Sequence, residues 1–218
     1  PSPARLDPES TRADELAHEV LRDAYRTFAV ERHPLDLYDF VGDEDRAILS
    51  RPHVLVSHNP SSNMKLGSGL ADVPAMLQSG IRVGLGTDGA ASNNTLDLYR
   101  EMRLAAFIAK ALHGDASALR ATDVIRMATC DGMVGLGFTD SGRIETGCQA
   151  DLQVLRLDHP SLTPLGEASA AIVYCGDGAR VESLMVDGQF LMYKHEIRTL
   201  DEERILAESV DAASKLYS

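Results

Sequence analysis

The chain has 218 residues, 44% of them hydrophobic and 25% charged, and carries a formal net charge of -12 at pH 7. This composition predicts a globular protein with one core, or one core and a small additional unit. No run of about 20 apolar residues is present, so we expect no membrane span, and the negative charge, which repels phosphate groups, predicts no nucleic-acid partner.

The cysteine spacing and the N-terminal residues indicate in which cellular compartment the protein is expected. Cys130, Cys148 and Cys175 lie far apart and form no C-x-x-C pair. This spacing matches neither a zinc knuckle nor a disulfide framework and fits reduced thiols. Residues 1–14 are too polar for a secretory signal. We therefore expect a cytoplasmic protein.

The first third of the chain predicts a loose arm followed by helices. Residues 1–14 are polar and show no periodicity, which is typical of an unstructured arm. In residues 15–28 an apolar residue recurs every four positions, as on one face of a helix. A second, short helix is expected after Asp43, because acidic residues there favour a helix N-terminus.

The middle of the chain has the pattern of a parallel sheet. Residues 53–57 and 81–86 are apolar runs without alternation, which indicates strands buried on both faces. A loop rich in Ser, Asn and Gly follows the first run, and a helix is expected over residues 74–79. A strand, a helix and a strand in this order predict two neighbouring parallel strands joined by a right-handed crossover.

Two helices and then a set of short strands are expected in the second half. The helices cover residues 95–112 and 122–136. Asp187-Gly188 is a strong signal for a two-residue hairpin turn, and residues 201–216 read as an amphipathic terminal helix. The expected strands are residues 143–145, 151–156, 170–174, 181–186 and 189–193.

Candidate site residues follow both buried strands. Asp88 stands where the second strand ends, and in a β/α barrel such side chains face the active-site mouth. From spacing alone, Asp88 could equally begin a turn before Gly89. His58 and Asn59 end the first strand; taken alone, His58 is more often a hydrogen-bonded structural histidine than a ligand.

Two longer motifs carry a resemblance to a known family. Residues 57–66 read SHNPSSNMKL and residues 83–94 read VGLGTDGAASNN. In this order they resemble the last two barrel strands of the amidohydrolase superfamily, in the branch of S-adenosylhomocysteine and methylthioadenosine deaminases, with chlorohydrolases as relatives. Residues 101–103 and the segments 142–147 and 150–152 continue the likeness. The match covers residues 43–193 and corresponds to the C-terminal portion of such enzymes.

The resemblance implies a fold and a division into parts. The expected fold class is α/β, a partial TIM (β/α) barrel with a small β-sandwich subdomain and a C-terminal helix. Residues 1–141 would form the loose arm and the barrel part, and residues 142–198 the β-sandwich subdomain. Residues 199–218 would form the terminal helix.

The resemblance also implies a chemistry. The expected reaction is hydrolysis at a carbon–nitrogen bond, or a carbon–chlorine bond, of a small heterocyclic substrate, foremost the deamination of an adenosine-like compound. Asp88 would bind a divalent metal, zinc or iron, and accept the proton of the attacking water. Asn63, Ser92 and Asn93 are expected to contact the substrate, although turn and helix-cap roles fit these residue types equally well.

Departures from the family pattern leave alternatives open. The family's other metal ligands include an H-x-H pair, and this sequence contains none. One middle strand is also missing, so we expect weak or no metal binding by this chain alone. The chain would then form a homo-oligomer or pair with a missing N-terminal half. The alternatives are a chlorohydrolase of the same branch, or a non-catalytic homologue that acts as an assembly subunit.

Overall fold

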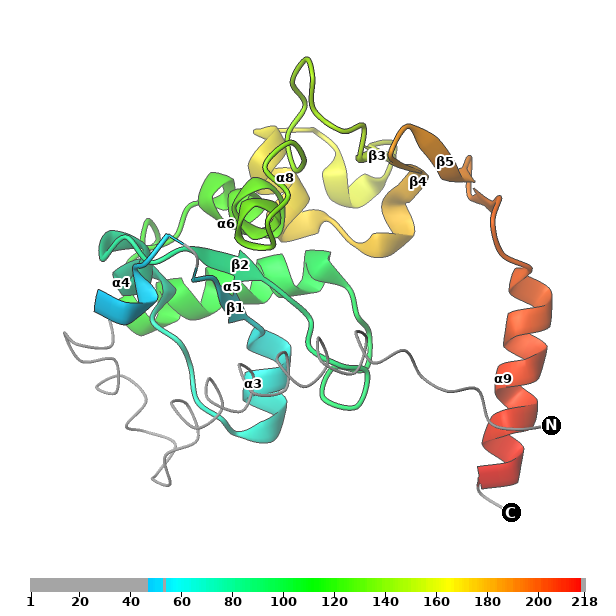
Figure 1. Ribbon diagram of the computed structural model, residues 1–218, viewed down its shortest axis with the longest axis horizontal. Coiled ribbons are helices and arrows are strands. Elements are labelled where there is room, and N and C mark those ends of the chain that lie inside the picture. The colour runs from blue at the N-terminus through cyan, green and yellow to red at the C-terminus, as the bar shows by residue number, and fades with distance from the viewer. Residues whose placement is uncertain (1–46, 53, 217–218) are drawn as a thin grey trace, which may run out of the picture. The chain divides into compact units, whose positions relative to one another are not determined.

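A computed structural model describes residues 47–52 and 54–216 (Figure 1). The described residues all belong to one compact unit. The expected arm and the helix over residues 15–28 lie outside the described residues. Residues 47–49 are helical, in agreement with the short helix expected after Asp43.

Two parallel strands confirm the predicted strand, helix and strand order. Strand β1 (Val56–His58) pairs with β2 (Val83–Leu85), and Val56 lies opposite Val83. Helix α4 (Val73–Gln78) connects them and begins where the Asp72 carboxylate accepts a hydrogen bond from the Ala75 amide at 3.0 Å. Within the described residues this sheet has two strands and does not close into a barrel.

Helix α3 (Pro60–Leu66) corrects the prediction of a loop after the first strand. Pro60 occupies the first turn, where its missing N–H costs nothing. Gly67 ends the helix in the left-handed conformation, with φ of 67°. The Ser and Asn content of the segment indicated a loop, but these two end signals enclose one short helix.

The core forms where helices pack on the two parallel strands. Helix α5 (Leu98–His113) presents buried residues at spacings of three and four, and Gly114, with φ of 60°, ends it. This confirms the helix expected over residues 95–112. The core consists of Val73, Met76, Ile81, Val83, Met102, Ala106, Ala109, Leu119, Val124, Met127 and Val173.

The single helix expected over residues 122–136 is wrong, because two helices stand there. Helix α6 (Ala121–Ala128) and helix α7 (Cys130–Gly135) are separated at Thr129, whose backbone has φ of -129° and ψ of -103°. The Thr129 hydroxyl donates to the carbonyl oxygen of Ile125 at 2.7 Å, a local bond that competes with regular helix geometry. The apolar periodicity continues across this break and does not reveal it.

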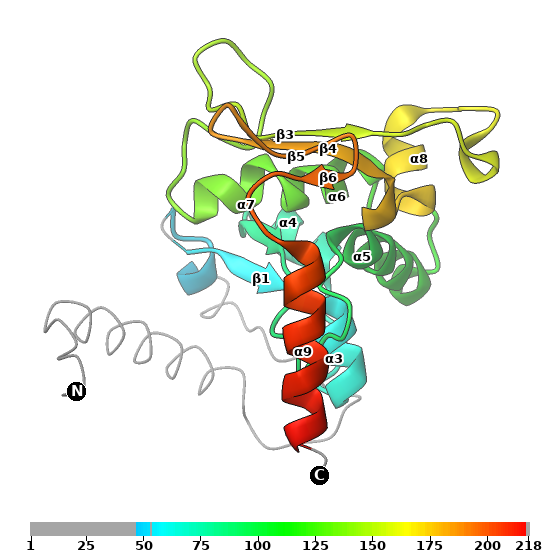
Figure 2. The ribbon, with the colours of Figure 1, turned by 90° about the vertical axis from the view of Figure 1, so that its right-hand side faces the viewer.

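Four strands form an antiparallel sheet in the order β3-β4-β5-β6 (Figure 2). They are β3 (Leu152–Leu155), β4 (Val181–Val186), β5 (Gln189–Tyr193) and β6 (Glu196–Ile197). Three of them confirm predicted strands, and β6 was not predicted. Asp187 and Gly188, with φ of 48° and 73°, form the predicted hairpin turn between β4 and β5. A second sheet facing this one, as in a sandwich, is not present among the described residues.

Two predicted strands are wrong. Residues 170–174 lie in helix α8 (Ala168–Cys175), where the Glu167 carboxylate accepts from the amides of Ser169 and Ala170 and so caps the helix. Val173 of this helix is fully buried in the core, so tertiary packing outweighs the strand preference of the Ile172-Val173-Tyr174 run. Residues 143–145 form no strand: they are irregular and lead into the turn at residues 146–147.

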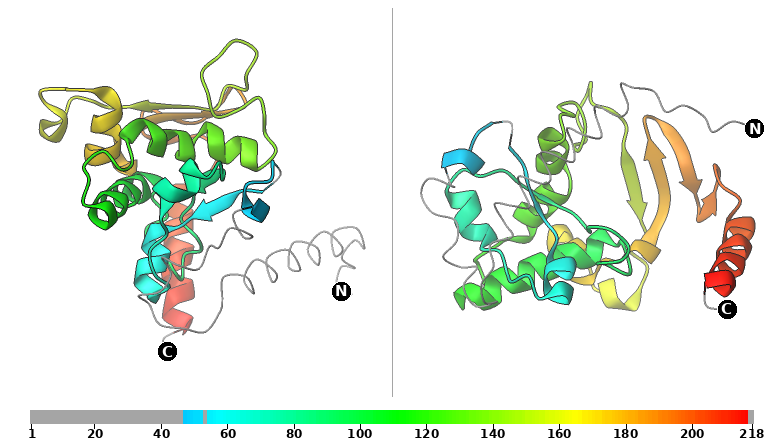
Figure 3. Two further views of the ribbon diagram at one scale, coloured as in Figure 1. Left: turned by 90° about the vertical axis from the view of Figure 1, so that its left-hand side faces the viewer. Right: turned by 60° about the horizontal axis from the view of Figure 1, so that its bottom comes forward.

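Short 3-10 helices flank α8, and a long helix follows the sheet (Figure 3). The short ones are η1 (Pro160–Leu162) and η2 (Gly178–Arg180). Helix α9 (Glu202–Leu216) confirms the predicted terminal helix, and none of its residues is buried. None of the described helices combines the length and apolar character needed to cross a membrane.

Candidate active site at the ends of the parallel strands

Asp88 lies just beyond β2 in an unusual backbone conformation. Its φ is 60°, in the left-handed region that only glycine enters freely, although Asp and Asn enter it more readily than other residues. The side chain is exposed. A non-glycine residue in this region needs surrounding contacts to hold it there.

Three hydrogen bonds fix the Asp88 carboxylate. Its Oδ2 accepts from the hydroxyl groups of Ser62 at 2.6 Å and Ser92 at 2.7 Å, and its Oδ1 accepts from the Gly89 amide at 2.8 Å. The Ser62 hydroxyl, then the Ser92 hydroxyl and the Gly89 amide, lower the pKa of Asp88 below its ordinary value. The carboxylate is therefore ionised at neutral pH and oriented.

The two serines come from the segments that follow the two strands. Ser62 is buried in the first turn of α3, after β1, and Ser92 follows β2. Since parallel strands end at the same edge of their sheet, these segments meet around Asp88. Lys65 adds a further link, since its ammonium group donates to the Ala91 carbonyl and to Asn94 Oδ1.

A second carboxylate, that of Glu101 in α5, lies next to the two segments that hold Asp88. Its side chain is 0% exposed. Its Oε2 accepts from the Ser61 amide at 3.0 Å, and its Oε1 accepts from Asn93 Nδ2 at 2.8 Å. One buried carboxylate thus joins the segment after β1 to the segment after β2.

The residues predicted to contact substrate have different surroundings. Ser92 is half-buried beside Asp88. Asn63 is half-buried in α3 rather than in a loop. Asn93 is buried, and besides its bond to Glu101 its Oδ1 accepts from the amide and hydroxyl of Thr95. These contacts of Asn93 hold the loop together, and substrate contact remains a prediction for all three residues.

His58 is buried in the position expected of a structural histidine, but its contacts differ from that expectation. The side chain is 3% exposed, and neither ring nitrogen has a hydrogen-bond partner within the described residues. Burial lowers the pKa of His58 to about 4, so the ring is neutral at pH 7. The prediction that His58 is hydrogen-bonded is therefore wrong for the described part of the chain.

Gly86 allows the two strand ends to approach each other. A side chain at this position would place its Cβ 2.8 Å from Ser57 Oγ and closer still to Asn59 Oδ1. Ser57 and Asn59 are linked by a hydrogen bond of 3.2 Å on the same face of the sheet. The glycine therefore keeps room for polar side chains at this edge.

Metal binding can be tested against the available donors. A catalytic zinc ion typically takes three protein ligands and a water. Within residues 47–52 and 54–216, no three His, Cys, Asp or Glu side chains come close enough together to hold a metal ion. Asp88 offers one carboxylate, so the described residues do not fit a complete metal site by themselves.

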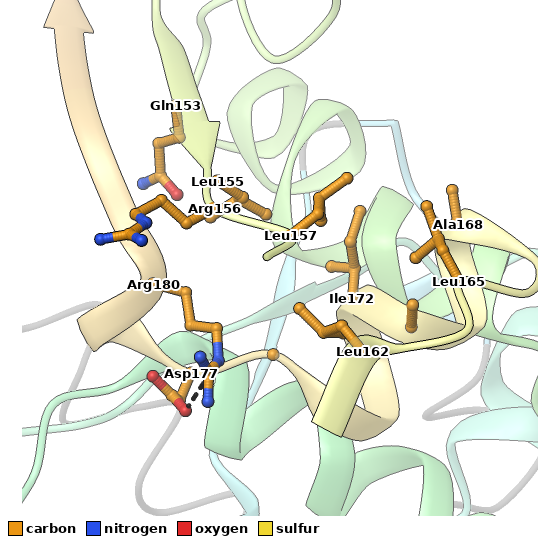
Figure 4. Close-up of a pocket in the computed structure, with 12 residues that line it drawn as sticks. Gln153, Leu155, Arg156, Leu157, Leu162, Leu165, Ala168, Ile172, Asp177 and Arg180 are labelled. Atoms are coloured by element: carbon orange, nitrogen blue, oxygen red, sulfur yellow. Dashed lines mark ion pairs between the residues drawn. The ribbon is translucent and has the colours of Figure 1, made fainter. Parts of the chain in front are cut away.

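A cavity of about 220 Å³ lies elsewhere, between β3, η1 and α8 (Figure 4). Leu155, Leu157, Leu162 and Ile172 are among its apolar lining residues, and the paired Arg180 and Asp177 stand at one side. None of the predicted site residues lines this cavity. The polar cluster around Asp88 is therefore separate from it.

Sequence analysis missed Ser62 and Glu101. A signal for Glu101 was available, because it shares one helix face with Ala105 and Ile108, both buried, at spacings of four and seven. A charged residue on an apolar face is a buried polar group that needs partners. Ser62 gave no such signal, since its bond to Asp88 joins residues 26 positions apart.

Comparison with known proteins points to one family. The sequence model described as "Amidohydrolase family" matches residues 21–191. The chain is 45% identical over 177 residues to a 5-methylthioadenosine/S-adenosylhomocysteine deaminase of Dictyoglomus thermophilum, covering 81% of this chain and 42% of that protein. It is 42% identical over 179 residues to a 5'-deoxyadenosine deaminase of Methanosarcina mazei, covering 82% and 41%.

Solved structures show the same relationship. An adenosine deaminase from Xanthomonas campestris with bound zinc superposes with a TM-score of 0.77 at 33% identity, covering 81% of this chain and 40% of that chain. An atrazine chlorohydrolase from Arthrobacter aurescens complexed with zinc gives a TM-score of 0.68 at 28% identity, covering 84% and 39%. The chain thus spans about 40% of the length of the curated relatives it matches.

Proposed function

This chain belongs to the amidohydrolase family, and from that premise we propose that the protein containing it hydrolytically deaminates an adenosine-like compound. The observation that carries the proposal is Asp88, an ionised and oriented carboxylate at the end of a buried parallel strand. The polar ends of strands are where barrel enzymes place catalytic groups.

In the proposed reaction, water attacks the ring carbon that carries the amino group. The two protons of this water end on the ring nitrogen and on the amino group. Asp88 accepts the first as the new carbon–oxygen bond forms and passes it on, and the second leaves the new hydroxyl group as the carbon–nitrogen bond breaks and ammonia departs. General base catalysis of this kind typically contributes about 100- to 10,000-fold to the rate. The two serine hydroxyls keep Oδ2 of Asp88 in a fixed orientation.

A divalent metal, zinc or iron, completes the proposal as a cofactor. Such an ion, when bound, lowers the pKa of water towards about 7 and so supplies the nucleophile at neutral pH. Asp88 would provide one ligand. The remaining ligands would come from residues outside the described part, in the same or another polypeptide. Zinc in two related structures supports this choice.

Dechlorination of a heterocycle is the second candidate, and the likeness to an atrazine chlorohydrolase favours it. The named deaminases are more similar to this chain, at 42% to 45% identity against 28% for the chlorohydrolase. This difference favours deamination. A non-catalytic assembly subunit is the remaining alternative. It would not require an oriented carboxylate at Asp88.

Three further expectations belong to the same proposal. We place the barrel part in residues up to 141, the β subdomain in residues 142–198 and the terminal helix in residues 199–218. Asn63, Ser92 and Asn93 would border the substrate. The protein would act in the cytoplasm on a small heterocyclic molecule, as a homo-oligomer or paired with a polypeptide that supplies the remaining barrel strands.

Turnover of 5'-deoxyadenosine and of a chlorotriazine by the metal-loaded protein tests the proposal. Asp88→Asn keeps the shape and the left-handed backbone but removes the proton acceptor, and should lower kcat by about 100-fold or more. Asp187→Asn is the matched control, because Asp187 has the same backbone conformation in the hairpin of β4 and β5. Wild-type turnover of both substrates by Asp88→Asn would show that Asp88 is a turn residue.

A further inference from the structure

The buried carboxylate of Glu101 stands between the two segments that hold Asp88. Glu101 is 0% exposed, and its two oxygens accept one hydrogen bond from each segment, from the Ser61 amide and from Asn93 Nδ2. Desolvating a carboxylate is expensive unless hydrogen bonds compensate for it. A buried carboxylate lowers the stability of the core unless its hydrogen bonds compensate, so the two bonds of Glu101 indicate a specific role.

The two donors that bind Glu101 are the chain neighbours of the two serines that bind Asp88. Ser61 precedes Ser62, and Asn93 follows Ser92. Both serine hydroxyls reach the same oxygen, Oδ2 of Asp88, at 2.6 Å and 2.7 Å. Because only one peptide unit separates the residues of each pair, anchoring Ser61 and Asn93 limits the positions that the two hydroxyls can take.

The start of α3 depends on Glu101 rather than on a cap of its own. Asn59 is the residue at the helix N-cap, and its side chain makes no capping hydrogen bond. Its Oδ1 instead accepts from the Ser57 hydroxyl. The Ser61 amide, one of the free N–H groups of the first helical turn, is satisfied by Glu101. The helix that carries Ser62 is thus anchored by a residue of α5.

We propose that Glu101 is a positioning residue for Asp88, which acts by holding the hydroxyls of Ser62 and Ser92 together on one carboxylate oxygen. This inference rests on the proposed function of Asp88. Within the described residues Glu101 makes its hydrogen bonds to Ser61 and Asn93 and none to Asp88. Its contribution passes through two backbone segments that come from different strands.

Glu101→Gln tests the proposal with a change of nearly equal shape. In Glu101 each donor faces a different carboxylate oxygen. The glutamine has one oxygen and one NH2 group, so either Ser61 or Asn93 faces the NH2 group and loses its acceptor. One serine then leaves Asp88, and kcat should fall about 10- to 100-fold while KM stays within about twofold. Met102→Leu is the matched control, since Met102 is the next residue of the same helix, is buried in the core and belongs to neither segment.

A double-mutant cycle separates positioning from general damage. If Glu101 acts through Asp88, then Glu101→Gln in an Asp88→Asn background should change the residual kcat by less than about twofold. If the two losses multiply instead, Glu101 acts independently of Asp88 and the proposal is overturned. An unchanged kcat in the single variant Glu101→Gln overturns it as well.

Amide spectra of the full, 15N-labelled chain give a readout that needs no activity. Glu101→Gln should shift the signals of Ser61, Ser62 and Ser92, whereas Met102→Leu should leave them in place. If these signals shift but the metal-loaded protein deaminates nothing, the proposed function fails and the positioning role stands. If deamination occurs and the signals do not shift, the positioning role fails and the function stands.

Asn93→Ala provides a second route if Glu101→Gln does not fold. This variant keeps the Glu101 charge and its bond to Ser61 but cuts the link to the segment after β2. The Ser92 signal should move and the Ser62 signal should stay. Movement of both signals, or of neither, would mean that Glu101 does not hold each segment through its own hydrogen bond, and would overturn the proposal.

Discussion

Two Asp-Gly pairs, one in each sheet region, show how differently the same dipeptide is used. Asp88-Gly89 follows the parallel strand β2, and Asp187-Gly188 forms the tip of the antiparallel hairpin. Both aspartates have positive φ, 60° and 48°. The Asp88 carboxylate accepts three hydrogen bonds, whereas that of Asp187 accepts none within the described residues. The local Asp-Gly sequence favours the positive φ of the aspartate in both places. The neighbouring elements decide whether the carboxylate is held by hydrogen bonds and can take part in a reaction.

The two regions are joined through α5. On one face Glu101 holds the strand-end segments. Elsewhere on the same helix, the Tyr99 hydroxyl donates to Gln153 of β3 at 2.6 Å and Arg103 donates to the Gly176 carbonyl at 2.7 Å. Burial, helped by the charge of Asp97, raises the pKa of Tyr99 to about 12. Helix α5 thus connects the polar cluster at the parallel strands to β3 and to the end of α8.

The largest effect is expected from His58 in the strand-end region. Its pKa is 6.5 in the unfolded chain and about 4 in the fold, so the unfolded chain binds a proton first as pH falls. The contribution of the neutral His58 ring to the free energy of unfolding is therefore fully present above pH 6.5. It decreases by about 3 kcal/mol as the pH falls from 6.5 to 4. His58→Leu should abolish this part of the decline in urea unfolding measured from pH 7 to pH 4.

The exposed His195, in the β5–β6 turn, provides the control for that experiment. His195→Asn keeps a residue that tolerates the positive φ of 65° and removes an exposed imidazole. Its free energy of unfolding at neutral pH should match that of the wild type, which would show that loss of an exposed imidazole does not by itself destabilise the fold. Equal pH dependence in His58→Leu and wild type would mean that a partner outside the described residues satisfies His58.

The second effect concerns the serines on Asp88. Ser62→Ala combined with Ser92→Ala removes two hydrogen bonds to an ionised group, and kcat/KM should fall about 10- to 100-fold. Because these bonds lower the pKa of Asp88, their loss raises it, and the acidic limb of the kcat/KM profile should move to higher pH. Ser141→Ala removes the similar Ser141 to Asp151 bond at the antiparallel sheet and should leave that limb in place.

A smaller effect is expected where the backbone itself is tightly packed. Gly142 has φ of 78°, and an added Cβ would lie 2.7 Å from the Cys130 Cα. Gly142→Ala should reduce the free energy of unfolding by about 2 kcal/mol. Gly147, with φ of 93° and open space around it, is the control, and Gly147→Ala should cost about 1 kcal/mol. Equal losses in urea unfolding would contradict the packing argument.

The smallest effect is expected from exposed ion pairs of the antiparallel region. Arg156 pairs with Asp158 through two hydrogen bonds at the surface. Exposed pairs of this kind contribute little, because water and salt screen them. Arg156→Ala should change turnover by less than about twofold. A loss comparable with that of the serine variant would show that chemistry extends into this region.

The sequence by itself determined the elements whose signals are local. Apolar runs without alternation identified the two buried strands, and Asp187-Gly188 identified the hairpin. The position of Asp88 just beyond a strand end also followed from the sequence, because the apolar run stops before Thr87-Asp88-Gly89, and β2 ends at Leu85. These features depend on residues next to one another in the chain.

Only the tertiary structure decided the features that depend on distant residues. Residues 170–174 became helical because Val173 enters the core formed around α5 and α6. The orientation of Asp88 depends on Ser62, 26 positions away, and the position of Ser61 depends on Glu101, 40 positions away. A hydrogen bond needs atoms within about 3 Å of each other, and periodicity along the chain carries no information on which distant segments reach that distance.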